Sequence, residues 1–134
     1  MSARDEELAR EWFDKAERDR LTADTMLSIT PPPTDVVCFH YQQVAEKYLK
    51  GFLAWHGTPL IKTHDLADLL TQCCVVEPRL VSLQPLAVLL TDYAVDVRYP
   101  GLPHSDPTDE ETSAVRDAAR EIRRAVRTGL SFSA

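Results

Sequence analysis

Glycine is scarce in this sequence, and its scarcity excludes several classes of enzyme. Only 4 of the 134 residues are glycine, at positions 51, 57, 101 and 129. These positions cannot form the glycine-rich loop that cradles phosphates or the glycine fingerprint of dinucleotide-binding folds. The sequence also contains no G-x-S-x-G turn to present a serine nucleophile. The protein is therefore not expected to use any of these three devices.

Cysteines and long apolar runs are also few. The 3 cysteines, Cys38 and the adjacent Cys73 and Cys74, are odd in number and irregularly spaced, which does not fit a disulfide framework. Adjacent side chains diverge on a helix and the histidines form no paired motif, so we predict no metal site and no cofactor. The longest apolar run is only 86–90, and the first ten residues are rich in charge. We therefore expect no membrane span, no secretory signal and a cytoplasmic protein.

An excess of basic charge is missing as well. The formal net charge is −6, whereas proteins that bind nucleic acids usually have a basic footprint, so tight non-specific binding to RNA or DNA is not expected. Basic residues are concentrated only in the stretch 116–127, which holds Arg116, Arg120, Arg123, Arg124 and Arg127. This arginine strip either contacts phosphates or complements the dipole of its own helix, whose first residues are acidic.

Helical periodicity is the main pattern that the sequence contains. Apolar residues recur every three or four positions in five segments, and no alternating strand pattern of useful length is present. The segments are about 5–28, 34–55, 63–73, one that begins between 78 and 85 and runs to 99, and one that begins at 106 or 108. We predict an all-α fold, an antiparallel up-and-down bundle of four longer helices and one short helix, in a single domain over residues 1–134.

Local signals mark the ends of several of these helices. Thr108 and Glu111 fit a capping box, and Gly57 stands where a left-handed residue would end the second segment. Pro85 is expected either to kink the fourth segment or to start it. The buried stripe predicted for the first segment is Leu8, Trp12, Ala16, Ala23 and Leu27, with Asp19 as an interruption.

An arginine and a histidine near the end of the fourth segment suggest a chemical site. Arg98 stands at the predicted helix end, and His104 follows in a proline-rich loop after five intervening residues. Arginine supplies a permanent planar cation suited to phosphate, and histidine can transfer protons near neutral pH. The pair is sufficient for RNA cleavage without a metal, with histidine as the base for the 2′-hydroxyl and arginine on the scissile phosphate.

Three sequence blocks together resemble the HEPN domain family. The blocks are 38–50 (CFHYQQVAEKYLK), 62–66 (KTHDL) and 92–100 (DYAVDVRYP), and the resemblance covers about residues 5–130. It implies a helical bundle that commonly dimerises. Many members of this family are metal-independent RNases with an arginine, four to six intervening residues and a histidine. Arg98 and His104 match that motif, and a homodimer would bring two such pairs into one cleft.

The resemblance also implies partners and binding residues. Some members work with a minimal nucleotidyltransferase as a toxin–antitoxin pair, and others are thought to bind nucleotides without cutting RNA. Candidate binding residues are Lys47, Lys50, Tyr93 and Tyr99, although the two lysines also fit the solvent side of the second helix. Asp106 stands where members that a nucleotidyltransferase modifies carry a tyrosine. A non-catalytic nucleotide-binding or adaptor protein is therefore the alternative to an RNase.

Overall fold

The computed structural model describes residues 2–63, 65–93 and 106–130, and over these ranges the only regular structure is helical. The helices there are α1 (Ala3–Leu27), α2 (Thr34–Trp55), α3 (Leu66–Val76), the 3₁₀ helix η1 (Pro78–Leu83), α4 (Gln84–Thr91) and α5 (Asp109–Thr128). The predicted all-α class is confirmed. No helix in the described part of the chain is long and apolar enough to span a bilayer.

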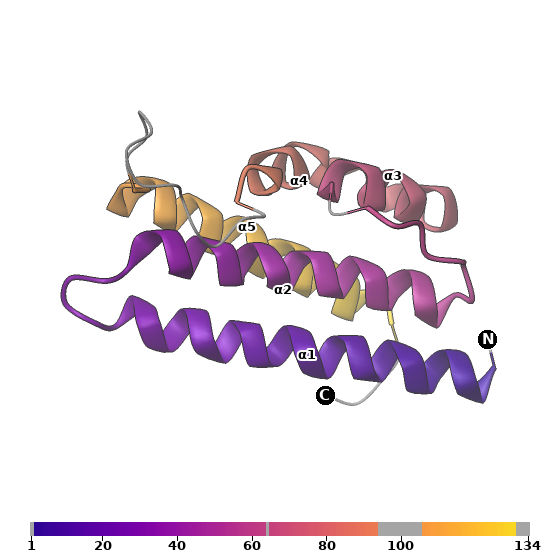
Figure 1. Ribbon diagram of the computed structural model, residues 1–134. Coiled ribbons are helices and arrows are strands. Elements are labelled where there is room, and N and C mark those ends of the chain that lie inside the picture. Colours follow the sequence, from indigo (N-terminus) through magenta and orange to yellow (C-terminus); the bar gives the residue numbers. More distant parts are fainter. Residues whose placement is uncertain (1, 64, 94–105, 131–134) are drawn as a thin grey trace.

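Helix α2 lies at the centre of the bundle. Helix α1 packs along one side of it, α5 along another, and α3, η1 and α4 follow one another along a third (Figure 1). Helices α2 and α5 run in one direction, and α1, α3 and α4 run in the other, which gives the predicted antiparallel arrangement. The central place of α2 agrees with its composition, because it supplies many of the largest fully buried side chains: Tyr41, Gln42, Tyr48, Leu49, Phe52 and Leu53.

The face that α1 buries against α2 differs in part from the predicted stripe. Ala9 and Phe13 are buried, whereas Leu8 is 44% exposed. The Phe13 ring stacks on Tyr48 with 5.2 Å between ring centroids, and it lies so close to Gly51 that a Cβ there would collide with it. Asp19, which interrupts the predicted stripe, is on the buried face with only 9% of its surface exposed. Glycine at one position and a buried carboxylate at another thus shape the contact between the two helices.

The chain between α3 and α5 departs from the long fourth helix that periodicity predicts. Residues 78–83 form the 3₁₀ helix, and α4 begins only at Gln84, with Pro85 in its first turn. Proline is tolerated in the first turn because its missing N–H has no intrahelical acceptor there. Of the two roles expected for Pro85, a kink or a helix start, the structure shows a start, within one residue. Helix α4 ends at Thr91, and residues 94–99 of the predicted segment lie outside the described residues.

The ends of α2 and α5 follow local sequence signals. Thr108 accepts a hydrogen bond from the N–H of Glu111, whose side chain accepts one from the N–H of Thr108, so the capping box is confirmed. Gly57 has a φ of 67°, in the left-handed region that ends α2 as predicted. The predicted stripe of α5 is buried throughout: Val115, Ala119, Ile122 and Val126.

Candidate functional site

The predicted catalytic residues fall between α4 and α5. Arg98 and His104, together with the candidate binding residue Tyr99, lie within 94–105, outside the described residues. The residues that flank that segment are described: Tyr93 follows Asp92, the C-terminal cap of α4, and Asp106 lies two residues before Thr108, the N-terminal cap of α5. Because α4 and α5 pack against each other, the segment is a connection between neighbouring helices.

Tyr93, a candidate binding residue, lies at the start of this connection. Its side chain is partly buried and packs against the hydrophobic core. Its backbone N–H donates to the carbonyl of Leu90 across 3.0 Å, which extends the last turn of α4. Tyr93 is thus anchored to the bundle at the point where the segment with Arg98 and His104 begins.

Lys47, a second candidate, joins α2 to α1. Its ammonium group donates to one carboxylate oxygen of Asp19, and Nδ1 of His40 lies 2.9 Å from the other. The Asp19 side chain is only 12% exposed, and those of His40 and Lys47 are 25% and 21% exposed. A buried carboxylate needs such partners, since an unpaired charge in this position is costly. Lys47 therefore helps to hold the two helices together.

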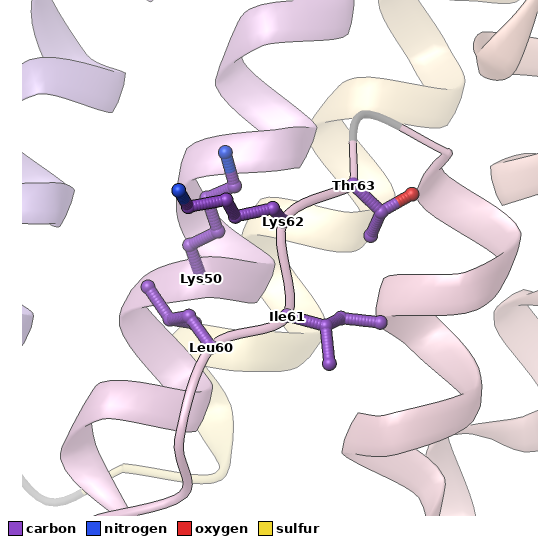
Figure 2. A pocket seen from close by; sticks show the side chains of 5 residues that line it. All are labelled: Lys50, Leu60, Ile61, Lys62 and Thr63. Carbon is purple, nitrogen blue, oxygen red and sulfur yellow. The ribbon is translucent and has the colours of Figure 1, made fainter.

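Lys50, a third candidate, lies three residues further along α2 and borders a pocket. Its Nζ is 3.1 Å from a carboxylate oxygen of Glu46 and 5.3 Å from the centre of the Trp12 ring on α1. The pocket is open, has a volume of about 450 Å³, and is lined by Lys50, Leu60, Ile61, Lys62 and Thr63 (Figure 2). Four of these residues come from the loop between α2 and α3, which passes over α2.

Sequence reasoning did not single out the loop residues of this pocket as binding residues. Lys62 lies within the KTHDL block, but its nearness to Lys50 depends on how the loop returns across α2 after Pro59. No local pattern of residues encodes that return. The pairing of Lys50 on α2 with Lys62 on the following loop is therefore visible only in the folded chain.

Two arginines of the α5 strip, Arg120 and Arg123, pair with carboxylates of α1, whereas Arg116 and Arg124 pair with Asp117 and Glu121 on α5 itself. Arg123 donates to both carboxylate oxygens of Glu17, at 2.8 and 3.0 Å, and Arg120 lies 3.7 Å from Asp24. Burial by itself would raise the pKa of Glu17, but hydrogen bonds from Arg123, Arg20 and Tyr48 outweigh it and lower the pKa to about 2. Arg120 and Arg123 therefore link α5 to α1 through their side chains, while α5 itself packs on α2 and α4.

Comparison with known proteins identifies the family. The model of the family described as "HEPN domain" matches residues 9–128. A crystal structure of the protein TT1696 from Thermus thermophilus is similar, with 28% identity, a TM-score of 0.74, and coverage of 91% of this chain and 98% of that one. A second similar structure is that of ST0689, described as an archaeal HEPN homologue, with 26% identity, a TM-score of 0.72, and coverage of 90% and 96%. Curated protein sequences give no significant match. The chain thus belongs to the HEPN domain family.

Proposed function

We propose that this HEPN protein is a metal-independent endoribonuclease. The observation that carries the proposal is the pair Arg98 and His104, with five residues between them, in a chain whose match to the HEPN domain family covers residues 9–128. The segment connects α4 to α5, two helices that pack together, so its ends are held by the bundle. On this proposal the chain acts as a single HEPN-like domain.

The proposed chemistry is transfer of the phosphoryl group within the RNA strand. Neutral His104 takes the proton of a 2′-hydroxyl, the 2′-oxygen bonds to the adjacent phosphorus, and the bond from phosphorus to the 5′-oxygen breaks. The guanidinium of Arg98 stabilises the charge that builds up on the phosphate oxygens. A protonated histidine returns a proton to the leaving 5′-oxygen, so the products are a 2′,3′-cyclic phosphate and a 5′-hydroxyl.

We also propose a homodimer that places two Arg98–His104 pairs in one cleft. The surface of α4 and η1 supports this, because Val81, Val88 and Leu89 are 63%, 56% and 38% exposed. Val81 and Val88 are separated by two helical turns and share a face with Pro85. Apolar residues grouped in this way are typical of a surface that packs against another chain. A symmetric interface there would bring the two connections after α4 close to the dimer axis.

A minimal nucleotidyltransferase is the proposed protein partner, in a two-component module. Asp106 favours a second candidate function within the same framework, because it lies two residues after His104, where modified members carry a tyrosine. Aspartate has no phenolic oxygen, so Asp106 cannot receive a nucleotide at the atom that is modified in those members. In this alternative the protein does not cut RNA but binds a nucleotide or serves as an adaptor for the nucleotidyltransferase.

The test is cleavage of RNA by the purified protein in the presence of a chelator. We expect RNA to be cut, with 2′,3′-cyclic phosphate ends, and DNA of the same sequence to remain intact because it lacks the attacking hydroxyl. A requirement for a divalent cation, or equal cleavage of DNA, would contradict the proposed mechanism. If RNA remains intact and the protein binds a nucleotide or a nucleotidyltransferase, the alternative function is the correct one.

A further inference from the structure

The pocket beside α2 combines two cations with apolar walls. Lys62 is exposed, and within the described residues no carboxylate forms an ion pair with it. Figure 2 shows the ammonium ends of Lys50 and Lys62 on the same side of the loop, and the Leu60 side chain points to that side as well. Leu60 is 37% exposed, which leaves an apolar surface next to the two charges.

The position of Lys50 is fixed before any ligand arrives. Its side chain is only 13% exposed, its Nζ bonds Glu46, and the Trp12 ring lies beside it. A lysine held in this way loses little side-chain entropy on binding an anion, which is a main cost of using lysine as a ligand. Lys62 is exposed and supplies the adaptable second contact.

The donors and charge of the pocket suit one phosphodiester group. The Thr63 hydroxyl points to the opposite side of the loop from the two ammonium groups, and its oxygen accepts a hydrogen bond from the N–H of Asp65 at 3.0 Å, so the two lysines supply the donors. Because Glu46 offsets the charge of Lys50, the two lysines and Glu46 together leave a formal charge of +1. A phosphodiester in an RNA strand has one negative charge, whereas a free nucleotide with a terminal phosphate has more. The volume of about 450 Å³ exceeds what a phosphate needs and leaves room for the attached nucleoside.

We propose that this pocket is a subsite for the RNA strand, in which Lys50 and Lys62 hold one phosphodiester and Leu60 contacts the adjoining nucleoside. The proposal rests on the proposed function in that it takes RNA as the substrate. It adds a binding position on the loop between α2 and α3, at residues outside the segment that holds Arg98 and His104. The acidic net charge makes such a local cation pair necessary, since the overall field repels a strand.

The experiment measures binding of a short, fluorescently labelled 2′-O-methyl RNA, which cannot be cleaved because its 2′-oxygen is blocked. We expect Lys62→Glu to weaken binding about tenfold or more and to lower the slope of log K against log salt by about 0.7, the contribution of one phosphate contact on a single strand. Lys15→Glu is the matched control. Lys15 is also an exposed lysine beside a pocket, but Glu11 and Asp14 line that pocket with it. Equal weakening by the two variants would overturn the subsite.

Two further measurements separate this proposal from the RNase proposal. His104→Ala should lose RNA cleavage, and within that variant Lys62→Glu should still weaken binding of the 2′-O-methyl strand, because Lys62 lies in this pocket and His104 acts at the cleavage step. If the wild type cuts no RNA but binds the strand through Lys62, the subsite stands and the RNase proposal fails. If the wild type cuts RNA and Lys62→Glu leaves strand binding unchanged, the subsite is overturned and the RNase proposal stands. Tighter Lys62-dependent binding of AMP than of the strand would overturn the subsite in favour of a free nucleotide.

Discussion

The helices on both sides of α2 bury apolar side chains, but the two sides differ in the polar pairs that join one helix to another. On one side, carboxylates of α1 take hydrogen bonds from α2 and α5: Asp19 from Lys47, and Glu17 from Tyr48 and Arg123. On the other side, α3, η1 and α4 bury a row of apolar side chains: Leu66, Leu69, Leu70, Leu80, Leu83, Ala87 and Leu90. We refer to α1, α2 and α5 as the polar-paired side and to α3, η1 and α4 as the apolar side.

This difference suggests different roles: the polar-paired side fixes the arrangement of its helices, and the apolar side has a surface available to other molecules. Polar pairs have strict geometry, so they fix how α1, α2 and α5 lie along one another, and their charges are neutralised in doing so. The apolar side also exposes Val75, Val81, Val88 and Leu89 to solvent. The proposed catalytic segment connects α4 of the apolar side to α5 of the polar-paired side. On this account the first side positions the segment and the second binds the partner copy.

Removing Asp19 should cause the largest loss of stability. We expect Asp19→Ala to lower the free energy of unfolding by about 3 kcal/mol, because Lys47 and His40 would keep their positions between the helices without a carboxylate. Chemical denaturation measures the change. Asp14→Ala, which removes an exposed carboxylate of the same helix, should change stability by less than about 0.5 kcal/mol. Equal effects of the two substitutions would show that the polar pairs do not secure α1.

A charge on the exposed apolar face should break the proposed dimer. Val88→Asp places a carboxylate where the partner copy would exclude water, and pairing it there is costly. Light scattering should give twice the 15.1 kDa chain mass for the wild type and a single chain mass for Val88→Asp. Leu21→Asp is the control, since Leu21 is 68% exposed on α1, and this variant should stay dimeric. Dissociation by Leu21→Asp alone would place the interface on the polar-paired side.

Acid should weaken the polar-paired side through Glu17. Its pKa is lowered from 4.5 to about 2 in the folded chain, so the folded state binds this proton less readily than the unfolded state. The stabilisation is present above pH 4.5 and is lost as the pH falls toward 2, by about 1–2 kcal/mol after allowance for solvent screening. Unfolding followed across this range should show the loss in the wild type. In Glu17→Gln, which has no charge to lose, the same range should produce a smaller decline.

The smallest expected effect is a difference in cysteine labelling. Burial raises the pKa of Cys73 to about 12, and Cys38 and Cys73 are both fully buried, whereas Cys74 is partly exposed. A thiol reagent should label Cys74 first. Cys73 should follow before Cys38, because short helices held by apolar contacts open more readily than α2, which polar pairs hold to α1. Mass spectrometry of the labelled peptides gives the order, and labelling of Cys38 before Cys73 would reverse the proposed ranking of the two sides.

Local features of the fold were predictable from the sequence, and long-range pairs were not. The cap formed by Thr108 and Glu111 joins residues three positions apart, so its pattern is visible in the chain. Asp19 could only be predicted as an interruption, because its partners His40 and Lys47 lie 21 and 28 residues away. The fourth segment was expected as one helix because periodicity does not distinguish a 3₁₀ turn followed by a short helix from one continuous helix.

Some residues of the candidate site were likewise predictable from the sequence, and others depend on the fold. Lys50 was identifiable because it lies on a strongly periodic helix and within a block that resembles the family. Lys62 was not identified as its partner, because the return of the loop over α2 is a tertiary feature. Arg98 and His104 were identifiable because a short spacing defines them. Their assignment to catalysis stays a prediction.

The most direct test of the account compares RNA cleavage by the wild type, Arg98→Ala and His104→Ala in one assay with chelator present. We expect the wild type to cut and each variant to lose activity by about 10²–10⁴-fold, the usual cost of removing a positioned proton-transfer or charge-stabilising group. Circular dichroism and light scattering should show unchanged helix content and dimerisation, because the polar-paired side holds the fold without these residues. Full activity of His104→Ala, with the fold intact, would contradict the central claim.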